Sequence, residues 1–172
     1  MLERSVGLDP GYAPAWSALA LRYYYDTSYG ASRNDKQMIV RSAAAYEKAL
    51  SLDPNFTEAA QGLIVFATEG GDLHEADAKA RDILRRRPRD PQAHFAMAYV
   101  LRYAGLLDES AKECDAALAL DPQNAGFRSC LFVFQQLNQY GRARDYLRLD
   151  AGSGWACRWR ALRTSGVGPS WG

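Results

Sequence analysis

The stretch APAWSALALRY, residues 13–23, decides the fold of this chain. Its apolar residues Trp16, Leu19, Ala20 and Tyr23 stand at positions i, i+3, i+4 and i+7. This spacing places them on one face of an α-helix. Pro14 stands near the first position of the helix, where its missing N–H costs nothing. The stretch therefore predicts an amphipathic helix that begins near residue 13 and needs a partner for its apolar face.

A tripeptide, Leu-Asp-Pro, recurs along the chain. Leu-Asp-Pro occurs three times and is joined by one degenerate copy, with its prolines at Pro10, Pro54, Pro88 (in Arg-Arg-Pro) and Pro122. The last two intervals are 34 residues each, and the first is 44 residues. The first interval thus equals one period plus an insertion of ten residues. A fixed period of this length is typical of a repeat protein built from stacked helix hairpins.

The residues inside the period resemble the tetratricopeptide repeat family. The family pattern is Trp-x2-Leu-Gly/Ala-x2-Tyr, followed by Ala-x3-Phe and a final proline. This chain has Trp16-x2-Leu19-Ala20-x2-Tyr23, followed by a second-helix segment that ends in a proline, with Tyr46, Ala49 and Pro54. The resemblance covers residues 1–150. It implies an all-α fold, a right-handed α-solenoid of about four helix hairpins with a short C-terminal capping helix.

The repeat predicts where the helices lie. The expected units span residues 13–54 with an insertion at 27–36, then 57–88, 91–122 and 125–150. First helices are expected near 13–26, 57–69, 91–104 and 125–137, and second helices near 37–52, 73–87, 108–120 and 140–150. Residues 151–172 are expected to form the capping helix, through Trp155, Trp159 and Leu162, and a loose tail. Residues 1–10 look like the end of a second helix whose first helix is absent, so the chain is expected to be part of a longer array or of a larger multidomain protein.

Composition excludes several classes of protein. The chain has 172 residues, of which 48% are hydrophobic and 24% charged, and its formal net charge is +1. This balance argues against a disordered chain and against a general attraction to nucleic acid. There is no apolar run long enough for a membrane span or a signal peptide. Three isolated cysteines without C-x-x-C spacing argue against a disulfide and for a reducing, cytoplasmic setting, with Cys114 an inert buried thiol and Cys130 near the groove.

The sequence contains no convincing active site. His74 stands among Asp72, Glu75 and Asp77, but no second cluster completes a four-ligand metal site. Asp72 is better explained as the cap of the next helix. His94 occupies a packing position of the repeat, and Gly70-Gly71 stands alone instead of in a phosphate-binding loop. The chain is therefore expected to be a non-enzyme without a metal or cofactor.

The family resemblance predicts a binding groove. In tetratricopeptide arrays the first helices line a concave groove, and ligands contact fixed positions of these helices. Carried over by register, the groove residues are expected to be Leu21, Tyr24, Tyr25, Val65, Phe95, Tyr99, Arg102, Tyr103 and Val133. Phe95, Tyr99 and Tyr103 are spaced by four and form an aromatic stripe. The Lys/Asn/Arg clamp of the family members that bind acidic chaperone tails is absent, so such a tail is not the expected ligand.

These expectations lead to one function and two alternatives. The leading hypothesis is a non-catalytic protein-interaction scaffold that binds a peptide or helix of a partner in its groove, with self-association through the uncapped N-terminal face. The first alternative is an accessory repeat domain of a larger bacterial signalling enzyme or transcriptional regulator. A weaker one is an RNA-binding helical repeat that uses the basic run Arg81, Arg85, Arg86, Arg87 and Arg89. Most of this run lies at a predicted helix C-terminus, where arginines are expected to be solvated. Contact with a membrane is not expected.

Overall fold

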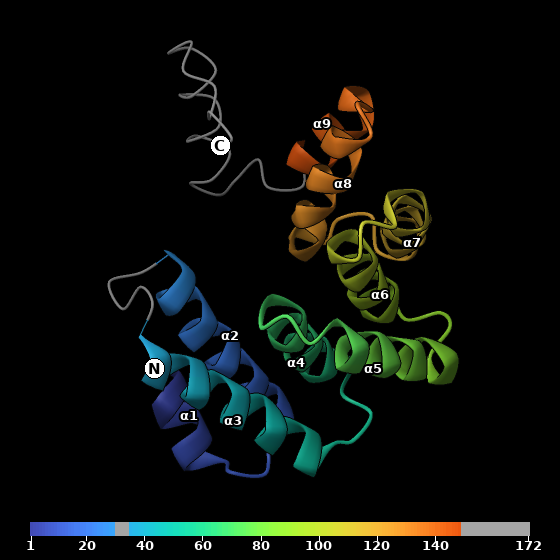
Figure 1. Ribbon diagram of the computed structural model, residues 1–172. Helices are drawn as coiled ribbons and strands as arrows, with labels where there is room; N and C mark the ends of the chain where they lie inside the picture. Colours follow the sequence, from blue (N-terminus) through green and yellow to red (C-terminus); the bar gives the residue numbers. More distant parts are fainter. Residues whose placement is uncertain (30–34, 149–172) are drawn as a thin grey trace, which may run out of the picture.

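The computed structural model describes residues 1–29 and 35–148, and within these residues the fold is all-α, with no strand. A short helix α1 (Leu2–Leu8) precedes four hairpins. The first three are α2 (Ala13–Tyr29) with α3 (Lys36–Leu52), α4 (Thr57–Glu69) with α5 (Leu73–Arg86), and α6 (Pro91–Tyr103) with α7 (Leu107–Leu120). The fourth combines a 3-10 helix η1 (Ala125–Cys130) and α8 (Leu131–Gln136) with α9 (Tyr140–Arg148). The hairpins stack in chain order into the expected α-solenoid (Figure 1).

The core lies within the hairpins and continues between successive ones. Small residues such as Ala20, Ala49 and Ala59 are fully buried where α2 and α3 meet α4. A second cluster joins α4, α5 and α6 around Ile64, and a third joins α6, α7 and the fourth hairpin around Phe127. Such a core explains why a single hairpin could not fold alone, because each one leaves an apolar face that only its neighbour covers.

Buried serine hydroxyls join the two helices of alternate hairpins. The Oγ of Ser42 on α3 donates a hydrogen bond of 2.6 Å to the carbonyl oxygen of Ala20 on α2. Two periods later, Ser110 Oγ on α7 donates one of 2.7 Å to the carbonyl of Ala98 on α6. The equivalent position of the intervening hairpin is Ala76, which is fully buried. Small residues at this position let the helix axes approach closely.

The turns inside the second and third hairpins each contain a glycine with positive φ. Gly71 and Gly105 have φ angles of 89° and 78°, the left-handed region that residues with a Cβ rarely adopt. The equivalent turn of the fourth hairpin uses Asn138, with φ of 59°. Asp72 caps α5 as expected, because its Oδ1 accepts a hydrogen bond of 3.0 Å from the backbone N–H of Glu75.

Two helices differ from the sequence-based expectation. The first helix of the array was expected to end at residue 26, yet α2 continues to Tyr29 and thus includes the start of the expected insertion. Thr27 supports the extra turn, since its side chain is buried and donates a hydrogen bond of 2.8 Å to the carbonyl of Tyr24. The first helix of the fourth unit was expected as one α-helix over 125–137, but it begins with the 3-10 segment η1. The expected capping helix and tail (151–172), and residues 30–34 of the expected insertion, lie outside the described residues.

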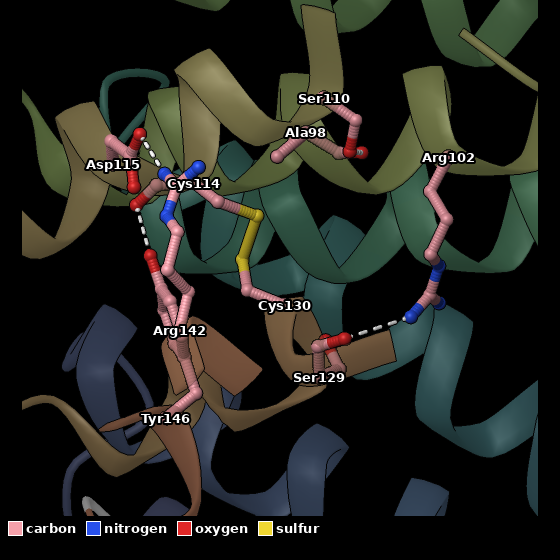
Figure 2. Close-up of a disulfide and its surroundings, with 9 residues drawn as sticks. All are labelled: Ala98, Arg102, Ser110, Cys114, Asp115, Ser129, Cys130, Arg142 and Tyr146. Atoms are coloured by element: carbon pink, nitrogen blue, oxygen red, sulfur yellow. Dashed lines mark hydrogen bonds and ion pairs between the residues drawn. A yellow bond between two sulfur atoms is a disulfide. The ribbon is translucent and has the colours of Figure 1, made fainter. Parts of the chain in front are cut away.

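Cys114 and Cys130 form a disulfide, which corrects the expectation of unpaired thiols (Figure 2). Cys114 lies on α7 and Cys130 at the end of η1, so the bond links the third hairpin to the fourth; their Cα atoms are 6.0 Å apart. Both residues are buried, and Cys130 lies in the core instead of beside the groove. The pairing was missed because the spacing of cysteines along the chain does not report which helices pack together. Because two of the three cysteines are paired, the cysteine content no longer argues for a reducing compartment. The cytoplasmic location stays a prediction.

Candidate functional site

A groove runs along the first helices of the hairpins. Its cavity has a volume of about 610 Å³ and is lined by side chains from α2 through α9. Eight of the nine expected groove residues line this cavity: Leu21, Tyr24, Tyr25, Val65, Phe95, Tyr99, Arg102 and Tyr103. The structure thus brings these residues together along one surface, although they come from three different hairpins. That they bind a ligand stays a prediction.

Val133 is the ninth expected residue, and its placement was wrong. Its side chain is only 1% exposed and packs in the core of the fourth hairpin. The cause is the 3-10 helix η1, which has about 3.0 residues per turn instead of 3.6 and so rotates the following residues relative to the expected register. Phe132, the residue before Val133, lines the groove in its place. The pattern of the preceding units gave no signal of this change.

The aromatic stripe on α6 ranges from buried to exposed. Phe95 is 6% exposed and packs on Phe127 with ring centroids 5.2 Å apart, so it belongs to the floor of the groove. Tyr99 stacks on Tyr103 with the same separation of 5.2 Å. Tyr103 is 46% exposed and forms the outer end of the stripe. Only the outer two rings are therefore available to a ligand without repacking of the core.

Glu69 connects three hairpins at the groove surface. Its Oε1 accepts a hydrogen bond of 2.9 Å from the hydroxyl of Tyr24 on α2 and one of 2.7 Å from the hydroxyl of Tyr99 on α6. Burial of the Tyr99 ring and the negative charge of Glu69 raise the pKa of the Tyr99 hydroxyl above its ordinary value. The carboxylate thus fixes the orientation of two predicted groove residues. Sequence reasoning placed these residues on the groove but did not predict their shared partner.

Arg102 packs against the rings of Tyr99 and Tyr103. Its guanidinium carbon lies 4.6 Å from the ring centroid of Tyr99, 5.1 Å from that of Tyr103 and 5.5 Å from that of Phe132. Contacts of this length between a guanidinium and aromatic faces are favourable cation–π interactions. Nη1 also donates a hydrogen bond of 3.0 Å to the carbonyl of Ser129. Arg102 therefore joins the third hairpin to the fourth along the groove.

Four of the five arginines of the basic run, which begins on α5 and continues beyond its end, are paired with nearby carboxylates. Asp82 pairs with both Arg85 and Arg86, at 2.6 and 2.8 Å. Arg81 pairs with Asp77 at 2.7 Å, and Arg87 approaches Asp90 at 3.5 Å. Such pairing weakens the electrostatic attraction that phosphates would need, so the RNA alternative is not favoured.

The histidines have structural surroundings. The Nδ1 of His94 lies 2.6 Å from an Oε atom of Glu113, and its Nε2 lies 3.0 Å from the carbonyl oxygen of Pro88. The ring thus joins α6 to α7 and to the preceding turn. His74 is exposed. Within residues 1–29 and 35–148, no three His, Cys, Asp or Glu side chains gather as a metal site would require, and no helix there is both long and apolar enough to cross a bilayer.

Comparison with known proteins adds similar structures but no family. No family model and no curated protein matches the sequence. Among solved structures, MamA from Desulfovibrio magneticus RS-1, from residue 41 to its end, is 13% identical with a TM-score of 0.49, and the match covers 89% of this chain and 84% of that one. A MamA structure from AMB-1 is 17% identical with a TM-score of 0.45, covering 98% and 85% of the two chains. The chain itself is an all-helical repeat solenoid with an aromatic groove along its first helices.

Proposed function

We propose that this chain is a non-catalytic protein-interaction scaffold of the tetratricopeptide type. It binds a peptide or helix of a partner protein in the groove of its first helices. The observation that supports this proposal is the single cavity that collects Tyr24, Tyr25, Tyr99, Arg102 and Tyr103 from two hairpins. Tyr and Arg are the residue types most often found as anchors of protein interfaces.

The shape of the groove favours a chain segment as the occupant. Lining residues extend from Ser17 on α2 to Leu147 on α9, so the groove follows most of the array. An occupant that contacts both ends must itself be extended or helical, as in recognition of a helix in a groove. Val65 and Leu21 add apolar surface between the tyrosines, which suits an amphipathic segment.

The N-terminal end of the array supports a second mode of association. Leu8 and Tyr12 are 77% and 55% exposed, and Val40 on α3 is 66% exposed. Exposed apolar side chains favour contact with a further protein surface. Self-association of this chain through its N-terminal face is therefore part of the proposal.

The proposal is tested by selecting binders from a library of random peptides displayed on phage, with the full chain immobilised. Selected peptides should lose binding to Tyr103→Ala, because the ring is exposed in the groove and its removal leaves the core intact. They should retain binding to the matched control Tyr140→Ala, a tyrosine that is 64% exposed on α9 and does not line the groove. Peptides that bind both variants equally would place the binding surface elsewhere.

A further inference from the structure

The groove contains two guanidinium groups that have no carboxylate partner among residues 1–29 and 35–148. Arg102 and Arg128 both line the cavity, and both side chains are partly buried. The ion pairs formed among the described residues include neither of them. Four of the five arginines of the α5 run, by contrast, are paired with an aspartate. The two groove cations therefore differ from the surface cations in their surroundings.

Arg102 is held in position by neutral groups. The ring centroids of Tyr99, Tyr103 and Phe132 lie within 5.5 Å of its guanidinium carbon. Its Nη1 donates a hydrogen bond to the carbonyl of Ser129 (Figure 2). A guanidinium has five N–H donors in a planar fork, and the hydrogen bond to Ser129 is the single one it forms among the described residues. The side chain is thus fixed in orientation and keeps most of its donors for a ligand.

Arg128 extends the same positive region along the groove. Its guanidinium lies 5.9 Å from the ring centroid of Tyr25, which comes from the first hairpin, whereas Arg128 itself lies on η1 of the fourth. Ser129, the residue after it, is the acceptor of the Arg102 hydrogen bond. Both arginines therefore line the groove, and each has an aromatic ring beside its guanidinium.

We infer that the part of the groove lined by Arg102 and Arg128 is a subsite for one Asp or Glu side chain of the partner segment, next to an aromatic or apolar residue of that segment. A partly buried cation that has lost some hydration gains most from an anion. The guanidinium fork matches a carboxylate geometrically, and such charge-assisted hydrogen bonds are stronger than neutral ones. The rings of Tyr99, Tyr103 and Phe132 would contact the neighbouring apolar side chain.

The remaining charges of the groove limit this subsite to a single acidic group. Glu58 and Glu69 are exposed and line the same cavity. A run of acidic residues would bring further carboxylates close to these two and would be repelled. The inference rests on the proposed function, because it identifies the chemistry of a segment that the groove is proposed to bind.

The test uses the selected phage peptides and a matched pair of synthetic peptides. Each acidic residue of the tightest peptide is replaced in turn by the uncharged amide, Glu by Gln or Asp by Asn, and binding is measured by fluorescence anisotropy. One replacement should weaken binding to the wild-type chain about tenfold, the expected size of one charge-assisted hydrogen bond. The same replacement should have little effect on binding to Arg102→Gln or Arg128→Gln. Arg86→Gln on α5 is the matched control and should behave as wild type.

The outcomes separate this inference from the proposed function. If the selected peptides depend on Tyr103 but have no acidic residue that couples to Arg102 or Arg128, the carboxylate subsite is wrong while the groove proposal stands. If the coupled anion is only the peptide's terminal carboxylate, the inference of a side-chain carboxylate is also wrong. If neither Tyr103→Ala nor Arg102→Gln changes the affinity, or if no peptide is selected, both the groove proposal and the carboxylate subsite are wrong.

Discussion

The hydroxyl of Tyr99 donates a hydrogen bond of 2.7 Å to Glu69, which lies 30 residues earlier on the preceding hairpin. Tyr24, from the hairpin before that, donates to the same carboxylate oxygen at 2.9 Å. One side chain thus joins three consecutive hairpins on their concave side. Because the apolar contacts of a solenoid act mainly between neighbours, this carboxylate adds a connection that the repeat alone does not supply.

Removal of the Tyr99 hydroxyl should reduce stability without disturbing the groove. In Tyr99→Phe the ring and its stacking remain, while Glu69 loses one donor. The expected loss is about 1 kcal/mol in the free energy of unfolding, measured by urea denaturation. The lost hydrogen bond has a charged acceptor, which strengthens it, but the Glu69 carboxylate is exposed to water, which weakens it. Tyr103→Phe is the control, since its hydroxyl has only a 3.5 Å contact with Tyr99 among the described residues. Equal effects of the two substitutions would contradict this role of Glu69.

Stability should fall steeply in alkaline solution. Burial raises the pKa of Tyr46, of Tyr99 and of Tyr146 above the ordinary value near 10. The folded chain therefore holds these protons where the unfolded chain loses them. Their contribution to stability is complete below the pKa of unfolded tyrosine, about 10, and is lost as the pH rises above it. Tyrosinate absorbance should show some tyrosines ionising only together with loss of helical circular dichroism, and a gradual ionisation of all tyrosines in the folded state would contradict the expectation.

Gly62 on α4 should resist replacement by alanine. The Cβ of an alanine would overlap the ring of Tyr46, whose Cε1 lies 2.7 Å from the Cβ position. Tyr46 is 5% exposed and packs between hairpins, so it has little room to move. We expect Gly62→Ala to lower the free energy of unfolding by about 1–3 kcal/mol through overpacking, although alanine is the better helix former by about 1 kcal/mol.

The control for this substitution is Gly141→Ala on α9, where the added Cβ would meet no atom within 4 Å. That variant should be neutral or slightly more stable. Combining Gly62→Ala with Tyr46→Leu should cost less than the sum of the two single changes, because the smaller side chain makes room. Strict additivity would mean that the ring does not cause the effect.

The disulfide should stabilise the fourth hairpin. It closes a loop with a sequence separation of 16 between Cys114 and Cys130, for which chain-entropy arguments give about 3 kcal/mol. Reduction, or the double change Cys114→Ser and Cys130→Ser, should lower the thermal midpoint and should expose α9 to amide hydrogen exchange before α2. Cys157→Ser is the control and should leave the midpoint unchanged. A thermal midpoint that is the same before and after reduction would contradict the Cys114–Cys130 disulfide.

The sequence predicted helices and the groove surface well because both depend on periodicity. Once Trp16 and the recurring prolines set the register, each groove position followed from its place in the repeat, as Val65 and Tyr99 illustrate. Val133 failed because η1 changes the number of residues per turn, which a repeat pattern cannot show. The Cys114–Cys130 bond and the Tyr99–Glu69 hydrogen bond depend on distances between hairpins. Such distances follow from packing and are not encoded in any local spacing.

The most direct test of the groove as the binding surface is the dissociation constant of a selected peptide for two variants of the full chain. Tyr99→Ala removes an aromatic anchor in the groove, and Arg86→Ala removes a cation of the α5 surface that is already paired with Asp82. Both variants should keep the helicity of the wild type. We expect Tyr99→Ala to weaken binding by about 2 kcal/mol, roughly thirtyfold, and Arg86→Ala to have almost no effect. If Arg86→Ala weakens binding and Tyr99→Ala does not, the groove is not the binding surface, and the basic surface at α5 is the site.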